Sequence, residues 1–249
     1  MAEGNPAKPF YSVLVLAFVC SALVAGAAVG LRPQQEANKE LDRKKHILYA
    51  ANLFEKGKSI GQLFGPVETR IIELATGEYV DDETLVPGPY RQLGDNEDLA
   101  RLRRVEKYSP VYLVRNGEQL EQIVLPVRGK GLWSTMYAYV ALDGDLTTIR
   151  GVSFYEHGET PGLGGEIENS RWQQEWQGKQ VYDDSGDVAL SFAKGKANEE
   201  GPEASHQIDG LSGATLTTKG VEGLMEFWFG DHGFKPFFAH LKNKDNSNG

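Results

Sequence analysis

The feature that most constrains this chain is an uninterrupted apolar run close to its N-terminus. Residues 10–31, FYSVLVLAFVCSALVAGAAVGL, contain no charged residue and match the roughly 20 residues that a bilayer-spanning helix needs. A cleaved signal peptide is the alternative, but its apolar core is shorter, at about 7–15 residues, and Lys8 gives only a weak basic start. We therefore expect a tail over residues 1–9, a retained transmembrane helix over residues 10–31 and an extramembrane body after it.

The charges beside this run favour a cytoplasmic body. The positive-inside rule places the more basic flank in the cytoplasm, although large domains cross the membrane largely regardless of charge. Cys20, the only cysteine, lies inside the run and can form no intrachain disulfide, so cysteine content is compatible with either side. Lys8 precedes the run, and the cations that follow it are Arg32, Lys39, Arg43, Lys44 and Lys45.

The rest of the composition indicates a folded domain with protein or small-molecule partners. The chain is 40% apolar and 24% charged, which is ordinary for a globular protein with a core. Its net charge of −9 argues against nucleic-acid binding, which requires clustered Lys and Arg. We expect a connecting helix within residues 32–60 and one extramembrane domain over residues 61–249, with short elements and loops over residues 63–104.

Four short runs rich in β-branched and aromatic residues predict a mostly antiparallel sheet. NG, RGKG and DGD turns separate them and suit hairpin connections. Helical pieces at residues 172–176 and 217–229 flank the sheet, so the expected class is α+β. The core of the domain would cover about residues 110–230, with strands over residues 111–114, 122–127, 136–142 and 148–156.

A Gly-rich loop follows the last of these strands. HGETPGLGGE, residues 157–166, contains four glycines and a proline. Backbone without Cβ atoms can approach a flat ligand closely and bond to its edges; an ordinary long turn is the alternative. Because no histidine or cysteine spacing typical of a metal site occurs, we expect His157 and Glu159 to be solvated and the chain to bind no metal.

A second Gly-rich segment, DGLSGATLTTKGV at residues 209–221, ends in a hydroxyl residue that opens a helix. Val221, Leu224, Met225 and Trp228 follow at the i, i+3, i+4, i+7 spacing of an amphipathic helix. Free amides and the positive end of the helix dipole would favour a phosphate beside Thr215. The alternative is a turn in which Ser212, Thr215 or Thr217 caps the helix.

The standard nucleotide-binding motifs are absent from the sequence. Neither GxGxxG nor a P-loop lysine motif occurs, so a dinucleotide or nucleoside triphosphate held in the standard ways is not expected. Ser212, in the second Gly-rich segment, does not lie in a GxSxG motif either. Trp133, Tyr137, Tyr139 and Tyr155 are expected to belong to the core, as aromatic residues on strands usually do.

The motifs in combination resemble a known family. DGLSGAT matches a flavinylation motif, which is Asp, two residues, Ser or Thr, Gly, Ala and a final Thr that carries FMN through a phosphoester bond. GKGLWSTMYAYVAL, HGETPGLGGEIEN and DGLSGATLTTKGV look like the C subunit, a flavoprotein, of sodium-translocating NADH:quinone oxidoreductases. The anchor and ELDRKKHILYAANLF are similar too, so the resemblance covers nearly the whole chain.

This resemblance implies a set of cofactor residues. Thr215 would carry the FMN covalently, and a flavin transferase that uses FAD as donor would recognise the motif residues Asp209, Ser212, Gly213 and Ala214. The HGETPGLGG loop would cover the isoalloxazine, with contacts from Thr160, Leu163 and Gly164. A cation near the flavin would stabilise its reduced anionic form; Lys194 is the candidate, and a solvated lysine is the alternative.

The resemblance also implies a role and a location. The chain would be an electron-transfer subunit of a bacterial inner-membrane complex that oxidises NADH, reduces ubiquinone and exports sodium, with no catalytic residues of its own. Its partners would be an iron–sulfur or iron donor and a second flavin subunit. The family places the body in the periplasm, against the flanking charges, and the span holds no carboxylate for an ion path.

Two alternatives remain open at the level of sequence. The G subunit of the related ferredoxin:NAD electron-transport complex shares the ETPGLG and SGAT motifs, although GKGLWSTMYAYVAL favours the quinone reductase. The other alternative is a membrane-anchored scaffolding subunit without a redox cofactor, in which the Gly-rich segments are only turns.

Overall fold

The computed structural model describes residues 7–86 and 88–247. The described residues divide into two units, one that ends at Lys44 and one that begins at Lys45. The first unit belongs to one long helix, α1 (Ala7–Ala50), which continues without interruption through the predicted span and most of the predicted connecting helix. Pro33 lies within α1 and cannot donate a backbone hydrogen bond there.

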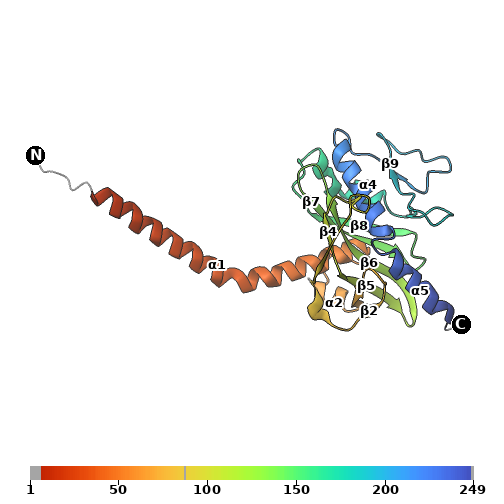
Figure 1. Cartoon of the computed structure of the whole chain (residues 1–249), viewed down its shortest axis with the longest axis horizontal. Helices are drawn as coiled ribbons and strands as arrows, with labels where there is room; N and C mark the ends of the chain where they lie inside the picture. Colours follow the sequence, from red (N-terminus) through yellow and green to blue (C-terminus); the bar gives the residue numbers. More distant parts are fainter. Residues whose placement is uncertain (1–6, 87, 248–249) are drawn as a thin grey trace, which may run out of the picture. The chain divides into compact units, whose positions relative to one another are not determined.

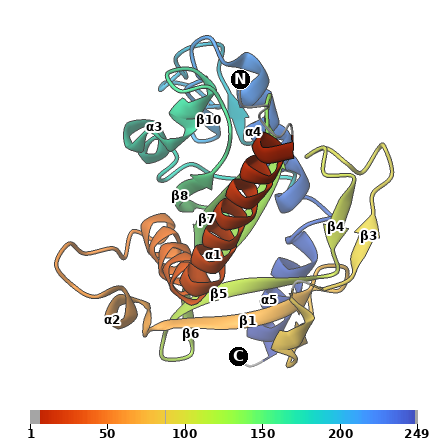
Figure 2. The same cartoon turned by 90° about the vertical axis from the view of Figure 1, so that its left-hand side faces the viewer.

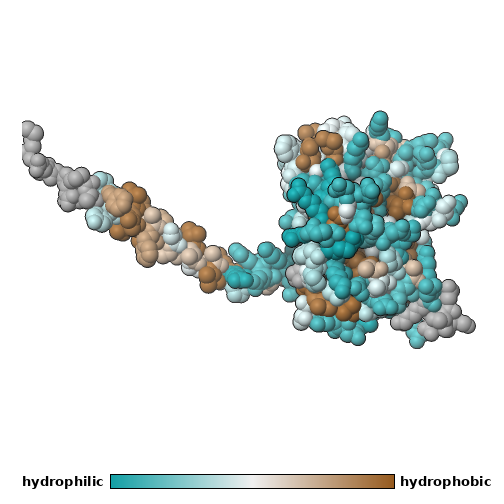
Figure 3. Space-filling model, in the orientation of Figure 1, coloured by the Kyte–Doolittle hydropathy of each residue, from teal (hydrophilic) through white to brown (hydrophobic). Residues whose placement is uncertain are grey.

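The N-terminal part of α1 has an apolar surface that the chain itself does not cover. Side chains from residue 9 to residue 42 are exposed, and the apolar stretch is the brown segment of the helix in Figure 3. Among the described residues, α1 is the one helix long and apolar enough to cross a membrane. An apolar surface of this length would be costly in water, so the helix fits the predicted anchor.

The second unit is built on a six-stranded sheet in which every neighbouring pair is antiparallel. Its strand order is β2-β1-β5-β6-β7-β8, and the central strands run side by side in Figure 1. The α+β class and the four predicted strands are confirmed. The strands are β1 (Val67–Glu73), β2 (Tyr79–Val80), β5 (Tyr108–Asn116), β6 (Gln119–Lys130), β7 (Thr135–Asp143) and β8 (Ile149–Glu156).

The strand β1 was not predicted as a member of this sheet. Residues 63–104 were expected to form short elements and loops, whereas β1 pairs with β5 along its full length. Only Val67, Ile71 and Ile72 of β1 are buried, and charged or polar side chains lie between Val67 and Ile71. Its apolar signal is therefore weak, and pairing with the strongly apolar β5 fixes it in place.

Both faces of the sheet are covered, which explains why its central strands read as nearly continuous apolar runs. In β7, Ala138, Val140 and Leu142 belong to the larger core, which includes α4 (Thr215–Phe229) and α5 (Lys235–Ser247). Tyr139 and Ala141 belong to the opposite core, with Ile47, Leu48 and Ala50 at the end of α1. In Figures 1 and 2, α4 and α5, drawn in blue, follow one another along the sheet.

The helix α4 confirms the predicted amphipathic pattern. Val221, Leu224, Met225 and Trp228 are all buried in the larger core, and the Trp228 indole donates to the Arg128 carbonyl at 2.7 Å. The helix α5 was not predicted, although its Phe237, Phe238 and Leu241 enter the same core.

Short elements complete the second unit. The hairpin β3 (Tyr90–Gln92) and β4 (Arg104–Glu106) is antiparallel, whereas β9 (Ser191–Phe192) and β10 (Gln207–Ile208) pair in parallel. The remaining helices are α2 (Ile60–Phe64), η1 (Glu83–Leu85), η2 (Gly164–Glu168) and α3 (Ser170–Gln174). Of these, η2 and the β9–β10 pair matter most for the site, because the two Gly-rich segments begin or end at them.

Candidate flavin site

The helix α4 begins at Thr215 without a side-chain cap. Its N-cap residue is Ala214, and among the described residues no side chain bonds to the first-turn amides in the way a cap would. Thr218 is the first residue to donate its N–H within the helix, to the Ala214 carbonyl at 3.0 Å. The interpretation that Ser212, Thr215 or Thr217 caps this helix is therefore wrong. Thr215 is exposed, so its hydroxyl lies at a helix start whose amides remain available to an anion.

The two Gly-rich segments meet beside Thr215. Gly213 has a left-handed backbone with φ of 71°, and a Cβ built on it would lie 3.0 Å from Leu163 Cδ2. The Leu163 side chain therefore packs against the turn that carries the motif. Leu163 is nevertheless 45% exposed, so much of its apolar surface remains free beside the turn.

Backbone hydrogen bonds shape the loop that carries Leu163. The Thr160 carbonyl accepts from Leu163 N at 3.1 Å and from Gly165 N at 2.9 Å. This bonding curls the loop into a compact turn, with the Thr160 side chain exposed and Gly164 buried. The predicted contacts Thr160, Leu163 and Gly164 thus belong to one turn, but only Leu163 is placed against the motif by a direct contact.

A buried carboxylate, Glu159, joins this loop to the rest of the site. Its Oε1 accepts from Trp133 N at 2.9 Å and Ser134 N at 3.2 Å. Its Oε2 accepts from Leu132 N at 3.2 Å and from the Thr217 hydroxyl at 2.6 Å. One side chain thereby connects the turn between β6 and β7, the Gly-rich loop and the first turn of α4.

The expectation that Glu159 is solvated is wrong, because only 4% of the residue is exposed. Burial raises the pKa of the Glu159 carboxyl, but hydrogen bonds from Thr217 and from the amides of Trp133, Ser134 and Leu132 outweigh burial and hold the pKa below its usual range. The carboxylate is therefore ionised at neutral pH. The sequence offered one signal for this burial, which is the position of the acid within a Gly-rich loop.

Glycines allow the three segments to approach this closely. A Cβ on Gly131 would lie 2.5 Å from Glu159 Oε1, and one on Gly164 would lie 2.4 Å from the Thr217 hydroxyl oxygen. A Cβ on Gly220 of α4 would lie 2.5 Å from the Lys130 carbonyl oxygen. Real Cβ atoms do not come this close, so these positions require glycine and the packing leaves no slack.

Asp209, the first residue of the motif, forms hydrogen bonds with neighbouring segments. Its Oδ1 accepts from Ala197 N at 2.7 Å, and its carbonyl accepts from the Trp172 indole at 2.8 Å. The next residue, Gly210, donates to the Gly195 carbonyl at 2.8 Å. These bonds place the loop that contains Lys194 beside the start of the motif, but the Lys194 side chain itself is exposed.

Large apolar side chains are exposed on the segments that meet around Thr215. Trp133 was expected in the core but is 66% exposed, because it lies in the Gly-rich turn before β7 rather than within a strand. Tyr139, by contrast, is buried as expected. A tryptophan directly after Gly-Lys-Gly-Leu could have indicated this exposure. The exposed apolar residues on these segments are Leu132, Trp133, Leu163 and Leu216.

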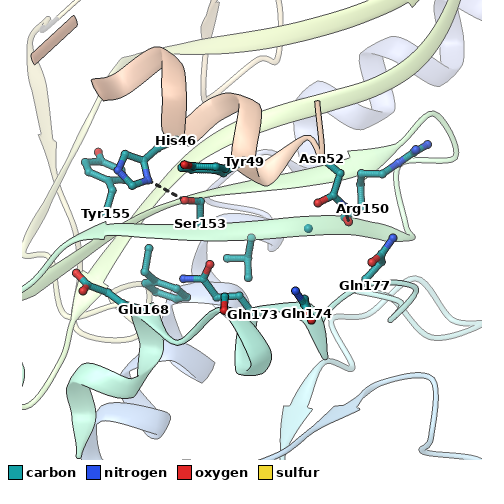
Figure 4. A pocket seen from close by; sticks show the side chains of 14 residues that line it. His46, Tyr49, Asn52, Arg150, Ser153, Tyr155, Glu168, Gln173, Gln174 and Gln177 are labelled. Carbon is teal, nitrogen blue, oxygen red and sulfur yellow. Dashed lines mark hydrogen bonds between the residues drawn. The ribbon is translucent and has the colours of Figure 1, made fainter. Parts of the chain in front are cut away.

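A groove of about 600 Å³ lies elsewhere in the second unit, beside β8. Figure 4 shows it between the last turns of α1, with His46 and Tyr49, and the glutamines of the α3 region. His46 Nδ1 lies 2.9 Å from the Ser153 hydroxyl at its wall. None of the predicted cofactor residues lines this groove. The candidate site around Thr215 therefore does not include this groove.

The comparisons with known proteins cover the part of the chain that contains α4. The FMN-binding domain model matches residues 131–229. This range runs from the turn between β6 and β7 to the end of α4. The crystal structure of NqrC from Shewanella oneidensis is similar, with a TM-score of 0.75 and 35% identity over 83% of this chain and 99% of that chain. The crystal structure of the C subunit of Na(+)-translocating NADH-quinone reductase from Parabacteroides distasonis has a TM-score of 0.63 and 26% identity, over 83% and 96%.

Relatives in sequence extend this likeness to nearly the whole chain. The C subunit of Na(+)-translocating NADH-quinone reductase from Pseudomonas aeruginosa is 44% identical, over 96% of this chain and 97% of its own length. The protein of the same name from Vibrio vulnificus is 42% identical, over 98% of each chain. With its FMN-binding domain, its fold and these relatives, the chain belongs to the family formed by the C subunits of the Na(+)-translocating NADH-quinone reductases.

Proposed function

We propose that this chain is the electron-transfer subunit of a sodium-translocating NADH:quinone reductase and carries FMN on Thr215 through a phosphoester bond. The observation that carries the proposal is the position of Thr215, exposed at the uncapped start of α4 and next to the Gly213–Leu163 contact. FMN supplies reversible one-electron and two-electron chemistry, which the side chains of the protein do not.

The residues present fit the phosphate end of such a group. A phosphodiester on Thr215 keeps one negative charge, and the uncapped first turn of α4 offers amide donors and the positive end of the helix dipole. That interaction is worth about 0.3–1 kcal/mol at an exposed helix start. The covalent bond, rather than this attraction, would retain the cofactor.

The residues also fit a flat aromatic ring. Leu163 packs against Gly213 and remains 45% exposed, so it can lie against one face of the isoalloxazine. Trp133 and Leu216 are exposed on the adjoining segments and are further candidates for ring contacts. Thr160 and Gly164 would shape the loop around the ring, and Lys194 is proposed as a nearby cation, supported by the bond between its loop and Gly210.

The motif residues would serve the enzyme that attaches the flavin. We propose that a flavin transferase takes FMN from FAD and recognises Asp209, Ser212, Gly213 and Ala214. Asp209 also anchors Ala197 by a hydrogen bond, so an Asp209→Asn variant separates the two roles: it keeps an acceptor oxygen for Ala197 but loses the charge. If Asp209→Asn folds normally and is not flavinylated, Asp209 serves the transferase.

Within the complex, the chain would pass electrons between an iron–sulfur or iron donor and a second flavin subunit. NADH oxidation, ubiquinone reduction and sodium export would be activities of the assembled translocase, because this chain shows neither a GxGxxG motif nor a carboxylate within residues 10–31. The part played by this chain would be to hold the flavin and present its exposed edge.

We propose a single-pass subunit of the bacterial inner membrane with its body in the periplasm. Family membership supports this placement, whereas the cations after the span favour the opposite side. Protease added to intact spheroplasts decides between them. The body should be digested there, and a body that stays protected until the cells are lysed would contradict the periplasmic placement.

One gel tests the covalent flavin. The denatured wild-type chain, produced in a host that supplies the flavin transferase, should give a fluorescent band and a mass increase of one FMN minus water. Thr215→Ala should abolish both, while Thr69→Ala, which alters an exposed threonine of β1 outside this site, should keep them. A wild-type band without flavin in such a host would favour the scaffolding alternative and reject the proposal.

A further inference from the structure

A single ionised side chain connects the turn between β6 and β7, the Gly-rich loop and the first turn of α4. The Glu159 carboxylate accepts hydrogen bonds from three amides of the turn at Leu132, Trp133 and Ser134 and from the Thr217 hydroxyl. None of these four donors is a cation, so the charge is balanced by oriented amides and a hydroxyl. Burying a charge is unfavourable. Here the burial is tolerated because each of the two carboxylate oxygens accepts two hydrogen bonds.

The carboxylate also occupies the same helix start as the proposed attachment point. Thr217 is two residues after Thr215 in the first turn of α4, and its hydroxyl donates to Glu159 Oε2 at 2.6 Å. A phosphodiester on Thr215 and the Glu159 carboxylate would therefore be two anions at one helix N-terminus. Because a fixed negative charge disfavours the addition of electrons nearby, Glu159 would act on the flavin as well as on the fold.

We propose that Glu159 is a positioning residue that assembles the flavin site before the cofactor arrives and, as an anion, lowers the reduction potential of the flavin. This inference rests on the proposed attachment of FMN at Thr215. Its first half concerns the chain without cofactor and can be tested there. Its second half concerns the loaded protein.

Glu159→Gln is the informative substitution, because it preserves shape and removes the charge. A glutamine has one acceptor oxygen and one NH2 group, whereas the site presents three amide donors and a hydroxyl to the two carboxylate oxygens. If the amide oxygen keeps the bonds to Trp133 and Ser134, the NH2 group faces the Leu132 N–H and that bond is lost. Glu166→Gln is the matched control, because Glu166 lies in the same segment and its side chain accepts a hydrogen bond from Asn169, outside this cluster.

Hydrogen exchange tests the first half in the full-length chain with Thr215→Ala, which cannot be loaded. Adding Glu159→Gln should make whichever of the amides of Leu132, Trp133 and Ser134 loses its bond exchange about tenfold faster, as expected for the loss of roughly one hydrogen bond. Adding Glu166→Gln should leave them unchanged. Unchanged exchange in the Glu159→Gln chain would overturn the proposal, and this arm does not depend on flavin.

The reduction potential tests the second half in the flavinylated chain. Glu159→Gln should shift the midpoint potential to a more positive value and change the flavin absorption bands, while Glu166→Gln should match the wild type. Thr217→Val removes the hydrogen bond from the hydroxyl but keeps the charge of Glu159. Its midpoint potential should therefore shift less than that of Glu159→Gln. It also serves if Glu159→Gln does not fold, because it should still accelerate exchange at Leu132 to Ser134.

The outcomes separate this inference from the proposed function. If the wild type carries no flavin although the transferase is present, the proposed function fails, and the exchange arm alone decides whether Glu159 assembles the site. If the wild type is loaded but Glu159→Gln has an unchanged potential and spectrum, Glu159 is a structural residue only and the inference is overturned. A loaded Thr217→Val chain with a shift as large as that of Glu159→Gln would show that the bond, not the charge, acts on the flavin, and would also overturn it.

Discussion

The Thr217 hydroxyl donates to Glu159 Oε2 at 2.6 Å across 58 positions of the chain. This bond joins the helix that starts at the proposed attachment residue to the Gly-rich loop after β8. Both groups are buried, so neither can exchange the bond for one to water. The stability of the site should therefore respond to anything that protonates, moves or crowds this pair.

The contribution of Glu159 to stability should depend on pH. Its pKa in the folded protein lies below the ordinary glutamate value of 4.5, so its stabilisation is present above that value and is lost as the pH falls through the lowered folded pKa. Urea unfolding of the detergent-solubilised chain should therefore show Glu159→Gln less stable than wild type at neutral pH, with the gap closing below about pH 4.5. A gap that persists undiminished at the lowest measurable pH would contradict the role of the charge.

Gly164→Ala should disturb the hydrogen bond between Thr217 and Glu159 although neither of these two residues is substituted. The added Cβ would lie 2.4 Å from the Thr217 hydroxyl oxygen and 3.0 Å from Glu159 Oε2, so the loop must shift, at a cost of about 1–3 kcal/mol. Gly61→Ala in α2 is the control, because nothing lies within 4 Å of its Cβ among the described residues and alanine favours helix. Urea unfolding should show a loss of stability for Gly164→Ala alone, and equal stabilities would mean that the loop packs more loosely than these distances require.

Two neighbouring tryptophans should respond differently to the same substitution. Trp172 donates its indole N–H to the Asp209 carbonyl at 2.8 Å, whereas the buried Trp176 Nε1 has no hydrogen-bond partner within the described part of the chain. Trp172→Phe removes packing and a bond, while Trp176→Phe removes packing and an unsatisfied donor. In urea unfolding, the free energy of unfolding of Trp172→Phe should be about 1 kcal/mol lower than that of Trp176→Phe. The opposite order would contradict the role of the hydrogen bond to Asp209.

Cys20 should report on the membrane environment of α1. It is exposed on the helix surface and lies within the apolar run of residues 10–31, where a bilayer would exclude water. A charged maleimide should label it poorly in permeabilised membranes and readily after solubilisation in SDS. In a Cys20→Ala background, Arg32→Cys at the end of the run should be labelled in both conditions. Equal labelling of Cys20 in both conditions would argue against a membrane span.

Local patterns in the sequence predicted much of this fold. The β-branched runs between hairpin turns became β5 to β8, and the i, i+3, i+4, i+7 spacing of Val221 to Trp228 became the buried face of α4. These elements carry their signal in their own residues. The strand β1 and the helix α5 do not: β1 is stabilised by pairing with β5, and α5 by packing of Phe237 and Phe238 into a core formed elsewhere.

The site could be predicted only in part, for the same reason. Thr215 and the Gly-rich segments are recognisable from their motifs, whereas the burial of Glu159 depends on amides that lie 25–27 residues away. The exposure of Trp133 likewise depends on where the turn after β6 is placed. Contacts between distant segments leave no period or spacing in a sequence, so they became visible only with the structure.

The uncapped start of α4 has a consequence for the order of maturation. The bonds of Glu159, Thr217 and Thr218 that set this helix start lie entirely between groups of the chain, so folding can finish while Thr215 is still an unmodified, exposed threonine. A transferase that reads the motif in its folded shape would then load correctly folded chains and pass over the others. Flavin attachment would in that case act as a quality check, marking those copies of the protein that are ready for assembly.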